Sequence, residues 1–158
     1  MRPLLRRTDA VLLGVAGLFS ACYLVCVTLQ VVFRYVLKLP LVWSEELALY
    51  LFIWSSLIAA ATLVGTNEHF SISCFADLLP ARVRRILDVG ITVLCIVFAL
   101  LVVAKGTEWS WRMRWASSAV LQIPQGAAYA VIPLTALYML LHLVDRLVRI
   151  LREQPREG

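Results

Sequence analysis

Four long apolar runs dominate the pattern of hydrophobic and polar positions along the chain. They cover about residues 10–33, 47–64, 86–104 and 127–144. Each has roughly the 18 to 25 residues that a helix needs to cross about 30 Å of hydrocarbon. Apart from Asp88 and His142, which lie near run ends, the runs contain no acidic, basic or histidine residue. The pattern predicts an all-α membrane protein, in which residues 1–158 form one domain of four transmembrane helices with short interfacial helical segments.

The first run also has features of a secretion signal, because Arg6 and Arg7 precede it. A signal core has roughly 7 to 15 apolar residues, however, and this run continues well past Cys22 to Phe33. We therefore expect the segment to remain in the protein as a transmembrane helix.

The stretch between the first two runs carries the signals of a helix start. Pro40 stops a helix that arrives from the N-terminal side, and Ser44 is expected to cap the first turn of the second helix. Glu45 and Glu46 follow where the helix dipole favours negative charge. Trp43 lies at the level expected for the aromatic belt of a membrane protein.

Two features modify the later helices. The third helix can continue past Ala104 into a stretch rich in Trp and Arg at residues 105–118. The fourth helix is expected to start after Pro124 and to contain Pro133, which removes one backbone hydrogen bond and can kink it. The stretch between the second and third runs has too few apolar residues to span, so we expect it at the cytoplasmic interface.

Composition agrees with a membrane protein, since 61% of the residues are hydrophobic and the mean hydropathy is +0.84. The net charge of +5 could suggest a nucleic-acid-binding protein. The charges flank the apolar runs and form no continuous basic face, however, so we expect no nucleic-acid partner. The lipid bilayer is the partner that this composition predicts.

The distribution of Lys and Arg predicts the orientation in the membrane. Ten of the 15 basic residues fall on one side, namely at the N-terminus, between the second and third runs, and at the C-terminus. The other five lie between runs one and two and between runs three and four. Both termini should therefore be cytoplasmic, and residues 34–46 and 105–125 should face outward.

Motifs for catalysis or cofactor binding are absent from the sequence, which contains no phosphate-binding loop, zinc-protease motif or nucleophile elbow. The four cysteines have no metal-ligand spacing, so we expect neither a metal nor an enzyme. His69 and His142 could in outline hold a haem between helices, as in the membrane anchor of a respiratory complex. A stand-alone small exporter is a third hypothesis, although the centres of the four spans are free of charge.

Short motifs near the ends of the runs follow one another in a characteristic order. They are Arg34-Tyr35, Trp43-Ser44-Glu45-Glu46, His69-Phe70-Ser71-Ile72, Ile123-Pro124 and Tyr129 followed by Ile132-Pro133. In this order and spacing, residues 10–144 resemble the small membrane (Q-type) subunit of tripartite ATP-independent periplasmic (TRAP) transporters. The cluster at residues 109–115 has no counterpart in that pattern.

The resemblance implies a subunit of the bacterial inner membrane with four transmembrane helices, cytoplasmic ends, no cofactor and no catalytic activity. It implies a larger multi-helix membrane subunit as partner, which binds substrate and sodium and moves. It also implies a periplasmic binding protein that delivers an organic acid. The small subunit would brace the moving subunit and offer part of the docking surface.

Two groups of residues are candidates for these contacts. The candidates for the partner interface are Arg34, Tyr35, Trp43, Ser44, Glu45, Glu46 and His69. The candidates for docking of the binding protein are Lys38, Trp109, Arg112, Arg114 and Trp115. Two plainer interpretations stay open: the charges can simply flank the helix ends, and the Trp and Arg residues can anchor the chain in the interfacial belt.

Overall fold

A computed structural model describes residues 2–66 and 81–152, and this part of the chain is helical apart from its connecting loops. The elements are α1 (Arg2–Tyr35), α2 (Val42–Thr66), α4 (Ala81–Arg112), the 3-10 turn η1 (Met113–Trp115), α5 (Gln125–Tyr129) and α6 (Val131–Arg152). Four stretches of the described residues are long and apolar enough to cross a membrane: Arg7–Tyr35, Val42–Val64, Arg85–Trp115 and Gln125–Arg152. The prediction of a multi-pass, all-α membrane protein is therefore confirmed.

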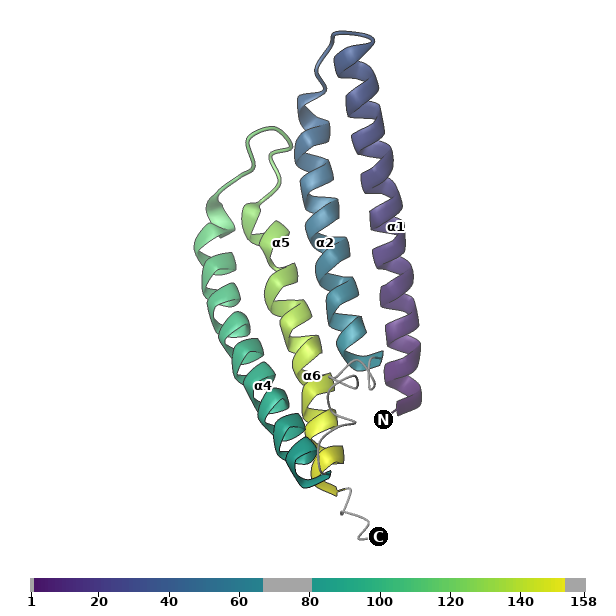
Figure 1. The fold of residues 1–158 in the computed structure, drawn as a ribbon. Helices are drawn as coiled ribbons and strands as arrows, with labels where there is room; N and C mark the ends of the chain where they lie inside the picture. Colours follow the sequence, from purple (N-terminus) through teal and green to yellow (C-terminus); the bar gives the residue numbers. More distant parts are fainter. Residues whose placement is uncertain (1, 67–80, 153–158) are drawn as a thin grey trace.

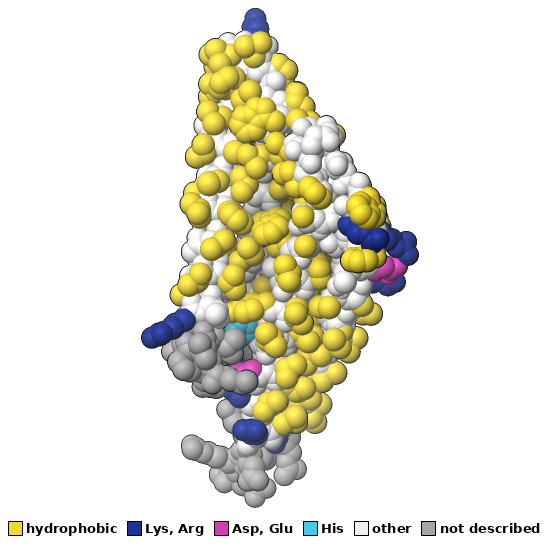
Figure 2. All heavy atoms as spheres, turned by 180° about the vertical axis from the view of Figure 1, so that it is seen from behind, with side chains coloured by type: hydrophobic (Ala, Val, Ile, Leu, Met, Phe, Trp, Pro, Cys, Tyr) yellow, Lys and Arg dark blue, Asp and Glu magenta, His cyan; other side chains and the backbone are white. Residues whose placement is uncertain are grey.

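The long helices form an open layer in the order α1, α2, α6, α4 (Figure 1). Each helix packs mainly on its neighbours. Helices α2 and α6, which lie between α1 and α4, therefore bury the largest share of their residues. About 28% of the apolar stretch is buried in α2 and in α6, against 6% in α1 and 11% in α4. Figure 2 shows hydrophobic side chains over most of one face of the layer. Such a surface is stable only against lipid or another apolar protein surface.

The α1–α2 hairpin is held by apolar residues at helical spacing. Ala16 of α1, Ile58 of α2 and Val131 of α6 form the buried centre of the layer. Phe19 packs edge-on against Trp54, with their ring centroids 6.2 Å apart. These contacts place the middle of α1 against both inner helices.

The start of α2 differs from the prediction. The helix begins at Val42, two residues before Ser44, so Ser44 lies inside the first turn. The Ser44 hydroxyl donates to the Leu41 carbonyl at 2.7 Å and so does not act as an N-cap. The predicted cap is wrong because the left-handed turn at Lys38 (φ 55°) and the following Pro40 already redirect the chain, which lets α2 start earlier.

The predictions for the third and fourth helices are confirmed. Helix α4 continues past Ala104 to Arg112. The fourth apolar run starts after Pro124 and is interrupted at Ala130, between α5 and α6. Pro133 has no N–H for the carbonyl four residues earlier, that of Tyr129, which explains a break at this point. His69 and the rest of residues 67–80 lie outside the described residues.

Gly126 permits a close backbone approach of α5 to α4 and η1. A Cβ at this position would lie 2.7 Å from the Ser110 carbonyl oxygen and 2.8 Å from the Arg114 Cα, whereas one at Gly14 would meet nothing within 4 Å. We predict that Gly126→Ala lowers the free energy of unfolding by about 1–3 kcal/mol, because backbone must move to admit the methyl group. Denaturant titration in detergent measures this, with Gly14→Ala as control. Equal stability of the two variants would contradict the close approach.

Candidate functional site: the hairpin ends of the helices

The tip of the α1–α2 hairpin brings together most of the predicted partner-interface residues. Arg34 and Tyr35 end α1, and Trp43, Glu45 and Glu46 lie in the first turns of α2. The Arg34 Nη1 atom lies 4.0 Å from the Glu45 Oε1 atom, and these side chains are 62% and 60% exposed. A pair this long and this exposed contributes at most about 1 kcal/mol, so both charges are accessible to another molecule.

Glu46 has a different role, within the chain. Its Oε2 atom accepts hydrogen bonds from the backbone N–H of Val120 (3.1 Å) and of Leu121 (2.9 Å). Its Oε1 atom accepts one from the Tyr50 hydroxyl at 3.2 Å. The carboxylate therefore ties α2 to the loop between η1 and α5, which is about 75 residues away in sequence. Local spacing carried no signal for this long-range contact.

Two further hydrogen bonds hold α5. The Trp54 indole N–H donates to the Ala128 carbonyl at 3.0 Å. The Ser110 hydroxyl of α4 donates to the Gly126 carbonyl at 2.6 Å. Together with Glu46, these side chains fix the outer half of the fourth apolar run between α2 and α4.

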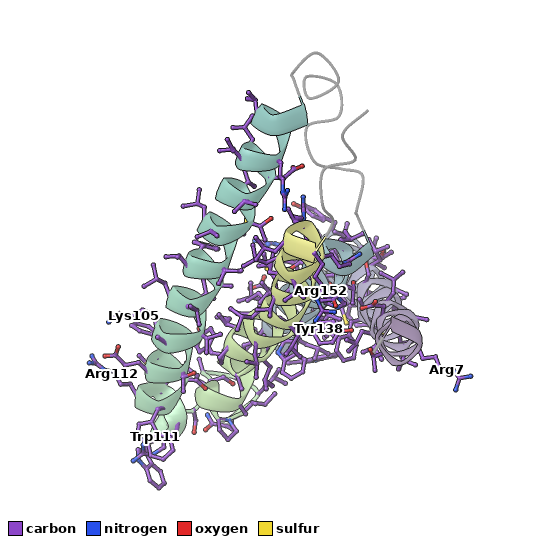
Figure 3. The ribbon with its side chains drawn as sticks, turned by 90° about the horizontal axis from the view of Figure 1, so that it is seen from below. Arg7, Lys105, Trp111, Arg112, Tyr138 and Arg152 are labelled. Atoms are coloured by element: carbon purple, nitrogen blue, oxygen red, sulfur yellow. The ribbon has the colours of Figure 1, made fainter. Side chains whose placement is uncertain are left out.

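The C-terminal end of α4 and the following η1 carry a cluster of aromatic and basic side chains. The Arg114 guanidinium lies 3.9 Å from the centre of the Trp111 ring and 5.3 Å from that of Trp115. These are cation–π contacts on rings that are themselves 68% and 84% exposed. Glu108 pairs with Lys105 at 3.1 Å and with Arg112 at 2.6 Å. Figure 3 shows Lys105, Trp111 and Arg112 pointing away from the other helices.

The predicted docking residues therefore form two separate patches. Lys38 lies at the tip of the α1–α2 hairpin, which we call the tip patch. The other four lie at the outer end of α4, at the opposite edge of the layer, and we call this group the α4 patch: Trp109, Arg112, Arg114 and Trp115.

A buried polar cluster between the N-terminal part of α1 and the middle of α6 escaped prediction. The Asp9 Oδ1 atom accepts a hydrogen bond from the Tyr138 hydroxyl at 2.6 Å, and that hydroxyl lies 3.0 Å from the Thr8 Oγ1 atom. The His142 Nε2 atom lies 3.2 Å from Asp9 Oδ1, within ion-pair distance but without hydrogen-bond geometry. Asp9 directly precedes the first apolar run, which starts at about Ala10, so the hydrophobic pattern does not place it among the packed residues of a span.

The cluster bears on the haem hypothesis. His142 is 7% exposed and faces Asp9 and the ring of Tyr138, with the Tyr138 and His142 ring centroids 4.8 Å apart. Asp9 of α1 and Tyr138 of α6 therefore hold the His142 ring between these two helices. Within residues 2–66 and 81–152, no three His, Cys, Asp or Glu side chains group closely enough to hold a metal ion.

Comparison with known proteins identifies the family. The family model for the DctQ component of tripartite ATP-independent periplasmic transporters matches residues 23–153. The chain belongs to this family. The resemblance drawn from the short motifs is thus confirmed, and the match includes α2, α4, α5 and α6.

Individual relatives of the chain carry the same assignment. The sialic acid TRAP transporter small permease protein SiaQ of Vibrio cholerae is 37% identical over 84 residues, which are 52% of this chain and 49% of SiaQ. A putative TRAP transporter small permease protein of Haemophilus influenzae is 26% identical over 125 residues, 78% of this chain and 77% of that protein. The isethionate TRAP transporter permease protein DctMQ of Oleidesulfovibrio alaskensis is 25% identical over 141 residues, 84% of this chain but 22% of DctMQ. The match thus spans about half of SiaQ and about a fifth of DctMQ.

The tie from Glu46 to the loop generates a prediction. Glu46→Gln removes the negative charge of the acceptor that both loop N–H groups share, so the amide oxygen that remains accepts them more weakly. We expect the amides of Val120 and Leu121 to exchange with deuterium several-fold faster in this variant. Hydrogen-exchange mass spectrometry of the peptide 116–124 measures the effect.

Glu45→Gln is the matched control, because Glu45 is one residue away and faces Arg34 at the exposed tip. In the Glu45→Gln variant, the amides of Val120 and Leu121 should exchange as in the unmodified chain. Identical exchange in the Glu46 and Glu45 variants would show that the carboxylate does not hold the loop.

Proposed function

We propose that this chain is the small membrane subunit of a TRAP-type secondary transporter and that it braces a larger, substrate-translocating membrane subunit. The observation that carries the proposal is the open layer itself. It leaves apolar side chains exposed on α1, α2, α4 and α6, and within residues 2–66 and 81–152 the buried ionisable side chains are Asp9 and His142. A solute or ion pathway normally places ionisable groups along the spans. Asp9 and His142 lie 3.2 Å apart near one end of the layer, and not along the length of the spans.

The relatives support a large membrane partner. In DctMQ the segment similar to this chain makes up 22% of one polypeptide. A subunit that is continuous with a much longer permease in one relative is well suited to bind such a permease as a separate chain. The apolar surface of the layer offers the area that this contact needs.

The substrate class that we propose is an organic acid, taken up with sodium and delivered by a periplasmic binding protein. The names of two relatives refer to sialic acid and isethionate, which are both organic acids. Sodium coupling and delivery follow from the family resemblance. In this scheme the translocating subunit and the binding protein choose the substrate, and the present chain serves as scaffold.

The contact residues can be narrowed from the candidates. Ser44 and Glu46 bond within the chain, and His69 lies outside the described residues. This leaves Arg34, Tyr35 and Glu45, together with Trp43 beside them, as the described partner-facing group. Tyr35 is 73% exposed and Trp43 is 43% exposed. The tip patch and the α4 patch are the proposed docking surfaces for the binding protein. With the termini in the cytoplasm, as the Lys and Arg bias favours, both patches face outward.

Uptake in cells that lack this chain tests the proposal. Deleting the chain should abolish uptake of the organic acid that the system transports, found by screening acids that include sialate and isethionate. The full chain should restore it, and the Arg34→Ala and Glu45→Gln variants should restore several-fold less, because their charges contact the partner. Lys105→Ala serves as a control, since Lys105 is 79% exposed on α4 and lies outside the partner-facing group.

Two outcomes would contradict different parts of the proposal. Uptake that persists in full without the chain, for every acid tested, would overturn the subunit role. Full restoration by both variants would leave that role standing and would exclude Arg34 and Glu45 as partner contacts.

A further inference from the structure

The apolar runs of neighbouring helices are displaced relative to one another along the helix axes. Ala16, Ile58 and Val131 lie at one level in the centre of the layer, and Gly106 of α4 meets Ile132 beside them. From this common level, the midpoint of each apolar run can be located with a rise of about 1.5 Å per residue. The midpoints do not coincide, although all four must lie near the middle of the bilayer.

The displacement grows steadily across the layer. The midpoint of the α1 run lies about 8 Å outward of the common level, and that of α2 about 4 Å outward. The midpoint of α6 lies about 7 Å inward and that of α4 about 16 Å inward. The two edge helices are thus displaced by about 24 Å, in the order in which the helices pack.

Polar residues at the helix ends show the same displacement independently. On the inner side, Arg7 of α1 lies about 14 Å from the common level, whereas Arg85 of α4 lies about 32 Å from it. On the outer side, Arg34 lies about 27 Å away and Arg112 about 9 Å away. The apolar band and both of its charged borders therefore slope in one direction, from the outer half of α1 to the inner half of α4.

We propose that the layer lies obliquely in the membrane, so that this sloping band becomes level with the hydrocarbon. Neighbouring helices pack 8–10 Å apart, so the outer axes of four helices are at most about 27 Å apart, and they are closer here because α1 also contacts α6. A displacement of about 24 Å over that width requires the helix axes to incline by at least about 40° within the plane of the layer. Transmembrane helices are tilted by about 20° on average.

This orientation specifies what the α4 edge of the layer contacts. Trp111, Arg114 and Trp115 reach the outer headgroups, where exposed aromatic rings and a guanidinium are favourable. In an upright layer they would lie about 15–20 Å closer to the cytoplasm than the tip of the α1–α2 hairpin, inside the hydrocarbon. Oblique insertion places the tip and the α4 patch at the same membrane surface.

Spin labels at two pairs of exposed positions distinguish the oblique from the upright layer. Leu24 and Leu94 lie about 30 Å apart along the helix axes, yet the oblique layer places both near the midplane, within about 5 Å in depth. Leu13 and Leu101 lie at nearly the same level along the axes, yet the oblique layer separates them by about 17 Å, in opposite leaflets. All four side chains are more than half exposed, so a label at any of them displaces little of the core.

The measurement uses the full chain in bilayers, together with whatever membrane protein is extracted with it. The native cysteines are replaced, one Leu→Cys change is labelled at a time, and depth is read from the ratio of collision rates with oxygen and with a polar nickel complex. We expect the Leu13–Leu101 depth gap to exceed the Leu24–Leu94 gap. The reverse order would overturn the oblique insertion. Val25 and Val93 can replace Leu24 and Leu94 if either variant is not extracted in folded form.

Discussion

The junction between the two helical hairpins, where α2 meets α5 and α6, is the contact on which the remaining structure depends. Lipid tails are as apolar as leucine side chains, so burying apolar area between helices gains little in a bilayer. Close packing of small residues and hydrogen bonds must then hold the helices together. The junction has both, in the buried Ala61 and Ala136 and in the bonds from Glu46 and Trp54.

The same constraint supports the proposed role as a scaffold subunit. An open layer leaves apolar side chains on both faces, and only its two inner helices are substantially buried. A layer of this kind is stable in lipid and can extend another membrane protein sideways without enclosing a cavity of its own. Its outward ends differ from its faces, because they carry charges and exposed aromatic rings that other proteins or headgroups can bind.

Much of the fold could be predicted from the sequence because the signals are local. The four apolar runs, the extension of α4 past Ala104 and the break before Pro133 all follow from composition or from the chemistry of one residue. The predicted cap at Ser44 is wrong because the turn at Lys38 and Pro40 starts α2 earlier.

Contacts between distant segments were the part that sequence patterns could not supply. Glu46 is in the first turns of a helix, where a simple flanking role is equally consistent, and only the fold shows that it holds the loop before α5. Asp9 and His142 are more than 130 residues apart, and no periodicity in one run refers to the other. The displacement of the apolar runs could not be predicted either. The sequence locates the midpoint of each run, but it does not say how far one helix is shifted along its axis relative to the next.

The most direct measurement of the central claim is to identify what the chain binds in its own membrane. The chain would be tagged at its chromosomal locus, extracted in mild detergent and purified. A scaffold subunit should bring a multi-helix membrane protein in stoichiometric amount, without haem absorption. A chain that purifies alone, or with a flavin or iron–sulfur protein and haem absorption, would contradict the scaffold role.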